Sequence, residues 1–355
     1  MPTAFTGAEA DRASNARRLL AAAAVLAVVL GACTEAGPSE ARDPTPSADP
    51  GITGTVLVSQ RFGGELATIE LPDGEPQPLT MPEDVRFVHA AYPLEDGQVL
   101  AVVEHGHARL RAYLLTAGTV EPVGPLLRRV HAFSFAAGHL LATRCDRSTS
   151  AWLLDLADPE RWIPASGACG ATLSPDGAEV AWSDGRRVLG APTVPAADPE
   201  PLFDAAELEG LPSGMRRLEV VGGLSWGPGG LAIPLGNSER QGAAVLEPDG
   251  AVGFTPLGDR GAGIGASLAW QPSGELLAVA SWGTLEAIVR VFPPRGDSRV
   301  VAMDADPIAG LVWSPGGDVL LAASQARWTF VTPAGAWIRS NPVPRGELVP
   351  IAWMG

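Results

Sequence analysis

One short pattern, a strand followed by a tight turn and a second strand, recurs six times in the 355-residue chain. Pro and Gly stand at most of these turns, as in "LVWSPGGDVLLAA" at residues 311–323. Pro presets the φ of a turn and Gly supplies a positive φ, so the pattern predicts β-hairpins. The copies start roughly 40 to 50 residues apart, which is the period of a four-stranded propeller blade. They begin at Ala90, Phe133, Ala171, Leu224, Leu268 and Leu311.

A bulky side chain precedes the turn in each copy. In a ring of wedge-shaped sheets this position fills the space between neighbouring blades. We therefore interpret these residues as core rather than as part of a cofactor site, and we predict no cofactor. They are Tyr92, Phe135, Leu173, Trp226, Trp270 and Trp313.

The two ends of the repeat region complement each other. Residues 55–80 match the second to fourth strands of a blade without a first, whereas residues 348–355 match a first strand alone. Pairing them closes a ring, which removes an unpaired sheet edge. The sequence thus predicts an all-β fold, a seven-bladed β-propeller over residues 54–355 with a composite closing blade. The copy near Phe133 has lost its turn motif, so merging or splitting it would give six or eight blades.

The N-terminus reads as a targeting segment. Three arginines precede an apolar run at residues 19–30, which is too short to span a bilayer comfortably and is typical of a secretory signal. The run ends in Leu30-Gly31-Ala32-Cys33, which resembles the lipobox of bacterial lipoproteins. This resemblance implies removal of residues 1–32 and acylation of Cys33. A plain secreted protein and an uncleaved anchor are the alternatives.

Residues 33–53 are rich in Pro, Ser, Ala and Asp without apolar periodicity, so we expect a flexible tether. With an acylated Cys33, the protein would be extracytoplasmic and lipid-anchored to the cell membrane. All 25 basic residues are Arg, which indicates a GC-rich genome and favours a high-GC actinobacterium. The formal charge of −15 argues against a nucleic-acid partner, because binding to phosphates requires basic side chains.

One turn carries a more specific resemblance. Ser174-Pro175-Asp176-Gly177 followed by Val180-Ala181 resembles the WD40-like repeat of TolB-type propellers, and the other copies vary this tetrapeptide. The resemblance spans residues 54–355 and implies the fold. It does not choose a function, because such propellers serve as scaffolds, ligand binders and enzyme gates. The α/β domain of TolB matches no segment of this chain, so its role is not carried over.

No catalytic residues are predicted. Residues 223–227 match the nucleophile pattern G-x-S-x-G, but that motif needs a strand, a sharp turn and a helix, and in this chain another strand follows. Cys145 ends a second strand and Cys169 begins the next blade's first strand, so both lie on one face. Outside the cytoplasm this placement predicts a disulfide, with two separate thiols as the alternative.

Four histidines fall on that same face. His89 and His131 stand where first strands begin, and His105 and His107 follow Glu104 after a second strand. Imidazoles with a carboxylate can bind Zn or sense pH. Their spacing does not require them to converge, so solvated or packing histidines remain the alternative and a metal remains unknown.

The connection from Asp204 to Val221 is longer than the others and should overhang this face. "DAAELEGL" predicts a short helix capped by Asp204, and Arg216 and Arg217 follow it. We interpret it as a partner-docking loop or a neutral insertion. Together these features predict a membrane-anchored binding or scaffold module for a cell-envelope protein. The alternatives are a small-ligand or metal-binding receptor or an enzyme with its site at the channel mouth, and a purely structural spacer.

Overall fold

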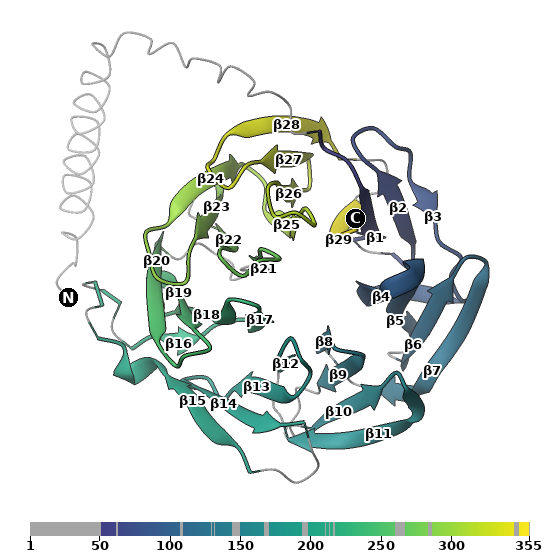
Figure 1. The fold of residues 1–355 in the computed structure, drawn as a ribbon, viewed down its shortest axis with the longest axis horizontal. Coiled ribbons are helices and arrows are strands. Elements are labelled where there is room, and N and C mark those ends of the chain that lie inside the picture. The colour runs from purple at the N-terminus through teal and green to yellow at the C-terminus, as the bar shows by residue number, and fades with distance from the viewer. Residues whose placement is uncertain are drawn as a thin grey trace, which may run out of the picture. The chain divides into compact units, whose positions relative to one another are not determined.

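The computed structural model describes most of the chain after residue 50 and builds it almost entirely from strands. Seven antiparallel sheets are arranged in a ring about a central axis (Figure 1). The predicted all-β, seven-bladed β-propeller is therefore confirmed, and the copy near Phe133 forms a blade of its own. The described residues are 51–61, 63–106, 109–128, 130, 132–143, 150–166, 170–193, 198–209, 211–212, 214–215, 217–259, 267–282, 286–343 and 348–354.

Each blade extends outward from an innermost strand near the central axis. Blade 1 contains, in that order, β29 (Leu348–Met354), β1 (Thr55–Gln60), β2 (Leu66–Glu70) and β3 (Gln77–Pro78). Blade 2 contains β4 (Val85–Pro93), β5 (Val99–His105), β6 (Arg109–Thr116) and β7 (Thr119–Arg128). Blade 3 contains β8 (Ala132–Ala136), β9 (His139–Thr143), β10 (Ser150–Asp155) and β11 (Asp158–Ser166). Blade 4 contains β12 (Thr172–Leu173), β13 (Glu179–Ser183), β14 (Arg187–Pro192) and β15 (Glu200–Asp204).

Blade 5 has an interrupted inner strand. Both β16 (Glu219–Val220) and β17 (Ser225–Gly227) pair with β18 (Gly230–Gly236), which continues to β19 (Arg240–Leu246) and β20 (Val252–Asp259). Blade 6 contains β21 (Ser267–Trp270), β22 (Leu277–Trp282), β23 (Ala287–Phe292) and β24 (Arg299–Asp304). Blade 7 contains β25 (Ile308–Trp313), β26 (Leu320–Ser324), β27 (Arg327–Val331) and β28 (Trp337–Pro342).

Two short 3₁₀ helices complete the described elements, η1 (Glu95–Gly97) and η2 (Ala205–Glu207). Within the described part of the chain, no helix is long and apolar enough to span a membrane.

The ring closes through the ladder between β1 and β29, as the composite blade predicts. Val56 pairs with Trp353, and the Trp353 indole N–H donates to the carbonyl of Thr53 at 3.0 Å. The Trp353 ring also packs edge-on against Phe330 of blade 7, with the centroids 5.9 Å apart. The C-terminal strand thus joins the N-terminal sheet and the last blade in one apolar cluster.

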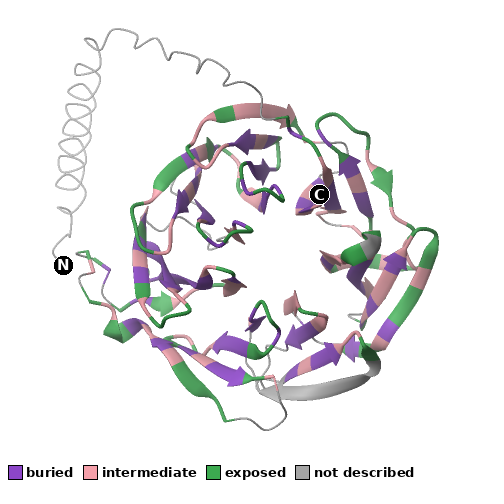
Figure 2. Cartoon of the chain, viewed as in Figure 1, coloured by how far each residue is buried: buried purple, intermediate pink, exposed green. Residues whose placement is uncertain are grey.

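Apolar contacts between blades hold the rest of the ring. Buried residues occupy the strands, and exposed ones gather at turns and outermost strands (Figure 2). The indole N–H of Trp313 donates to the Ala269 carbonyl of the preceding blade at 3.0 Å, and Tyr92 stacks on Phe135 with centroids 5.4 Å apart. The core role predicted for the bulky residue before each turn is confirmed at these positions.

The turns between first and second strands are held by a repeated hydrogen-bond pattern. In blade 4 the Ser174 hydroxyl donates to Asp176 Oδ1 at 2.6 Å and accepts from the Glu179 amide at 2.9 Å. Gly177 completes the turn with a φ of 70°, a conformation that favours glycine. The Ser174 hydroxyl and then the Ala178 amide hold the pKa of Asp176 below its ordinary value of 3.8.

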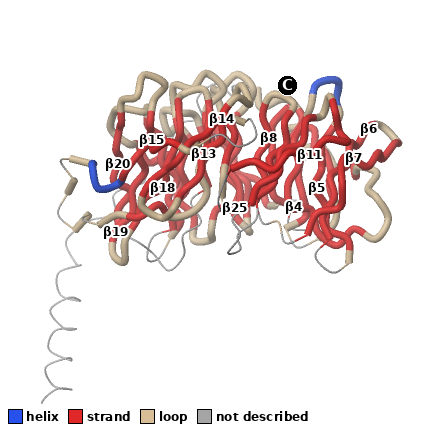
Figure 3. The backbone as a smooth tube through the Cα atoms, turned by 90° about the horizontal axis from the view of Figure 1, so that it is seen from below, coloured by secondary structure: helices blue, strands red, loops and turns tan. Residues whose placement is uncertain are grey.

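The ring has two faces, and the strands run between them (Figure 3). The turn face carries the turns that join first to second and third to fourth strands. The loop face carries the second-to-third loops and the connections between blades. Residues 51–54 lie beside the end of β29, so both ends of the described chain are on the turn face.

The closing contact predicts a large loss of stability when Trp353 is truncated. Trp353 is 8% exposed, so Trp353→Ala should lower the free energy of unfolding by about 3–5 kcal/mol. The matched control is Trp337→Ala, because Trp337 is 49% exposed on β28 and its removal should change stability by only about 0.5 kcal/mol. Chemical denaturation followed by circular dichroism measures both. Equal losses in the two variants would contradict the role given to Trp353.

The turn of blade 4 predicts a contribution to acid sensitivity. A carboxyl whose pKa is lower in the folded state stabilises the fold above its unfolded pKa, and this stabilisation is lost as the pH falls through the folded value. For Asp176 the loss occurs below pH 3.8. Asp176→Asn keeps the acceptor oxygen but not the titration, so its free energy of unfolding should fall less steeply with acid. Denaturation at a series of pH values tests this, and an unchanged slope would count against it.

Candidate functional site

The structure describes four of the predicted site residues, and three of them, Glu104, His105 and Arg217, are on the loop face. The fourth, His89, is the fifth of the nine residues of β4 and not at the start of that strand, where the sequence predicts it. His89 lies in β4, Glu104 and His105 end β5, and Arg217 lies in the connection between blades 4 and 5. The other predicted residues are outside the described part of the chain, so the lipidation and the disulfide stay predictions. These are Cys33, His107, His131, Cys145, Cys169 and Arg216.

His89 and Glu104 form one polar pair. A hydrogen bond of 2.9 Å joins His89 Nε2 to Glu104 Oε2. His89 is the extra residue of a β-bulge, because Val88 pairs with Val103 and Ala90 with Val102. A bulge re-aims a side chain, and the imidazole edge contacts Phe133 of blade 3, with the ring centroids 6.4 Å apart.

His105 belongs to a second, separate pair. A hydrogen bond of 3.0 Å joins its Nε2 to the Tyr113 hydroxyl, and the two rings lie 5.5 Å apart. Glu104 and His105 are neighbours in β5, so their side chains point to opposite sides of the blade. The described histidines therefore do not converge on one site.

A shallow depression of about 690 Å³ surrounds His105. Its charged lining mixes both signs, with Glu83 and Asp84 facing Arg86 and Arg109. In the described residues no three His, Cys, Asp or Glu side chains come together as metal ligands do. The depression offers charged side chains of both signs.

The nucleophile pattern at residues 223–227 is not a nucleophile elbow. Ser225 lies in β17, and the Pro228-Gly229 turn leads directly into β18 rather than into a helix. The dismissal of this pattern is confirmed.

The insertion between blades 4 and 5 is anchored to the ring. Its predicted helix exists as the single 3₁₀ turn η2, where Asp204 accepts a hydrogen bond from the Ala206 amide at 2.8 Å. Met215 and Leu218 are buried in the core shared by these blades, and Asn237 donates to the Gly214 carbonyl at 2.9 Å. Arg217 is exposed beside them.

Charge is distributed unequally between the two faces, which the linear sequence does not reveal. At the described ends of loop-face connections, arginines are mixed with carboxylates; these arginines are Arg61, Arg86, Arg109, Arg128, Arg186, Arg187, Arg217, Arg240 and Arg327. On the turn face, Arg295 lies in a described turn and Arg299 begins the strand that follows it. The described turns of this face also contain many carboxylates. These are Asp73, Glu75, Glu95, Asp176, Asp198, Glu247, Asp249, Glu275, Asp297 and Asp318.

Comparison with known proteins shows likeness in fold only. No family model matches the sequence, and no curated protein matches it. Among solved structures, TolB from Acinetobacter baumannii is 14% identical with a TM-score of 0.50; the alignment covers 85% of this chain and 66% of that one. A putative 6-phosphogluconolactonase from Bacteroides uniformis is 15% identical with a TM-score of 0.55, covering 84% of this chain and 98% of that one.

A WD40 protein gives a similar result. The Swd1 β-propeller domain of Myceliophteria thermophila is 13% identical with a TM-score of 0.50, covering 72% of this chain and 87% of that one. At such low identities a shared fold does not carry a shared function. The likeness to TolB and to WD40 propellers therefore supports a seven-bladed β-propeller and leaves the function to be argued from the surface.

Proposed function

We propose that the protein is a membrane-anchored extracytoplasmic lipoprotein whose propeller is a binding or scaffold module for a cell-envelope protein. The lipobox-like residues 30–33 after an apolar run support the anchor. Residues 33–53 then act as the tether, and the ring acts as a rigid support for loops, which suits recognition.

The observation that carries the proposal is where the chain enters the ring. Residues 51–54 join blade 1 on the turn face, beside Trp353. A tether from Cys33 would therefore be attached at the turn face and not among the loop-face connections. The loop face presents Glu104, which is hydrogen-bonded to His89 of β4, the depression at His105 and the anchored insertion.

A receptor or enzyme with its site at the channel mouth has less support. His89 and His105 lie on opposite sides of blade 2, and the described residues include no metal-ligand group. Polar pairs of mixed sign are instead typical of protein contact surfaces, where they fix partner and register.

The anchor predicts that Cys33 controls the location of the protein. With Cys33→Ser, the acylation site is lost, and the protein should move from the membrane fraction to the soluble extracytoplasmic fraction or remain uncleaved. Fractionation with mass spectrometry of the N-terminal peptide measures this. Cys145→Ser is the matched control and should stay acylated and membrane-bound. An unacylated wild-type Cys33 would reject the anchor.

The loop face predicts a discrete partner. A photo-crosslinking amino acid at Arg109, which is exposed on this face, should capture one envelope protein in intact cells, whereas the same group at Glu275 on the turn face should not capture it. Replacing His89, His105, His107 and His131 with Ala should reduce capture by about tenfold or more, the effect of losing a contact hot spot.

Circular dichroism of this histidine variant separates lost binding from lost folding. Repeated failure of the Arg109 probe to capture any envelope protein would contradict the scaffold proposal. Equal capture from both faces would contradict the assignment of the loop face.

A further inference from the structure

A groove of about 680 Å³ lies between blades 4 and 5 on the turn face. Its lining includes the apolar side chains of Leu202, Trp226 and Leu231 and the carboxylates Asp176 and Glu179 of blade 4. None of the described residues that line it is basic. The groove thus combines an apolar surface with uncompensated negative charge.

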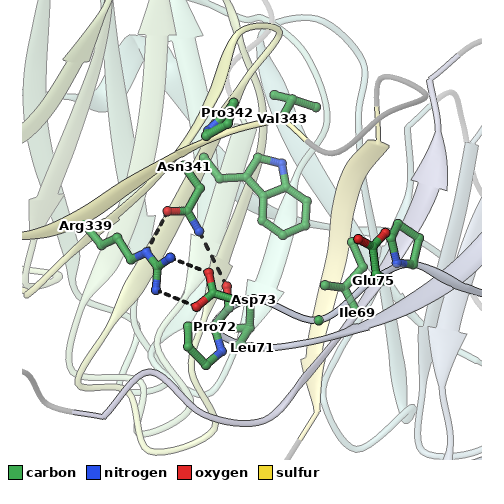
Figure 4. A pocket seen from close by; sticks show the side chains of 12 residues that line it. Ile69, Leu71, Pro72, Asp73, Glu75, Arg339, Asn341, Pro342 and Val343 are labelled. Atoms are coloured by element: carbon green, nitrogen blue, oxygen red, sulfur yellow. Dashed lines mark hydrogen bonds and ion pairs between the residues drawn. The ribbon is translucent and has the colours of Figure 1, made fainter.

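A groove of about 640 Å³ between blades 7 and 1 contains a cation from the chain itself (Figure 4). There the Arg339 guanidinium from β28 forms an ion pair with Asp73. Arg339 Nε also donates to Asn341 Oδ1 at 2.6 Å, and the Asn341 amide reaches the Pro72 carbonyl at 3.5 Å. An arginine therefore bridges the outer strand of one blade and the turn of the next.

The strand register identifies the matching position at blades 4 and 5. Ser174 and Ser314 occupy equivalent turns, since each hydroxyl accepts the amide five residues later. Ala181 lies seven residues after Ser174 and pairs with Gly190. Leu321 lies seven residues after Ser314 and pairs with Phe330. Gly190 pairs in turn with Glu200 of the outermost strand of blade 4. Phe330 pairs with Arg339 of the outermost strand of blade 7. A carboxylate therefore stands where the other groove has its arginine.

The neighbouring turn does not supply the missing cation. Residues 248–250, Pro-Asp-Gly, repeat the sequence of residues 72–74. Asp249, however, is paired with Arg295 of blade 6 at 2.8 Å, and Glu247 is paired with the same arginine. Arg295 joins blades 5 and 6, so the described lining of the groove between blades 4 and 5 has no basic residue of its own.

Trp226 differs from its counterparts in its hydrogen bonding. Trp270 and Trp313 occupy the same position in blades 6 and 7, and each donates its indole N–H to a carbonyl of the preceding blade. In the described structure no hydrogen bond joins the Trp226 indole N–H to another residue, and the side chain is only half-buried in the groove wall. A cation can rest on such a ring.

We propose that this groove binds an arginine side chain of a partner protein, much as the groove between blades 7 and 1 contains Arg339 of the chain itself. The guanidinium would lie between Asp176 and Glu179, and its methylene stem would cover Leu202, Leu231 and the Trp226 ring. A planar guanidinium suits both the paired carboxylates and the aromatic face. The acidic turn face would also speed the approach of a basic partner.

This site goes beyond the function proposed above, because it is on the opposite face and depends neither on the lipid anchor nor on the histidines. The probe is the peptide acetyl-Gly-Leu-Arg-Gly-amide, titrated into the full chain in detergent and measured by calorimetry. The same peptide with citrulline, an uncharged isostere of arginine, tests the charge. We expect saturable binding of the arginine peptide and binding about tenfold weaker for the citrulline peptide.

The decisive variant is Asp176→Asn with Glu179→Gln, which should also weaken binding by about tenfold. Asn at 176 keeps the acceptor for Ser174, and circular dichroism verifies the fold. The matched control, Glu275→Gln with Asp318→Asn, removes two carboxylates from the equivalent turns of blades 6 and 7 and should bind normally. The proposal is overturned by absent binding, by equal binding of citrulline, or by equal weakening in the control.

Discussion

The whole ring depends on one ladder, in which β29 at the C-terminal end pairs with β1 at the start of the folded region. Trp353 fixes this ladder on both sides, through the Thr53 carbonyl and the face of Phe330. The two bonded residues are 300 positions apart, but the entropy cost of closing a loop grows only slowly with its length. Without the ladder, blade 1 would lose its inner strand and blade 7 its apolar neighbour, so ring closure and the core of these two blades depend on the same contacts.

Most of the architecture follows from local sequence signals. Turn residues, alternating strands and a bulky residue before each turn predict the blades, and the unmatched ends predict the composite closure. No local signal predicts the interrupted inner strand of blade 5. Its two parts, β16 and β17, are separated at Gly222 and Gly223, and their common partner β18 becomes apparent only once the strands are paired. Local patterns do not contain that long-range information.

The candidate site is less predictable for the same physical reason. The loop-face placement of Glu104 and His105 follows from strand alternation, whereas His89 lies in the middle of β4 and not where the strand begins. The contact of His89 with Glu104 depends on a bulge in the β4–β5 register. The site predicted from the sequence is built around histidines and cysteines. It therefore misses Tyr113, which is hydrogen-bonded to His105, and Glu83, which lines the depression.

The division of charge between the faces connects the fold to recognition. Antiparallel strands send alternate connections to opposite faces, so a chain can place acidic turns on one face and mixed loops on the other without disturbing the apolar contacts between blades. Where the chain supplies its own arginine, as at Asp73 and Asp249, an acidic turn is neutralised and two blades are joined. Between blades 4 and 5, where Glu200 replaces that arginine, the same geometry leaves a surface that a basic partner can complete.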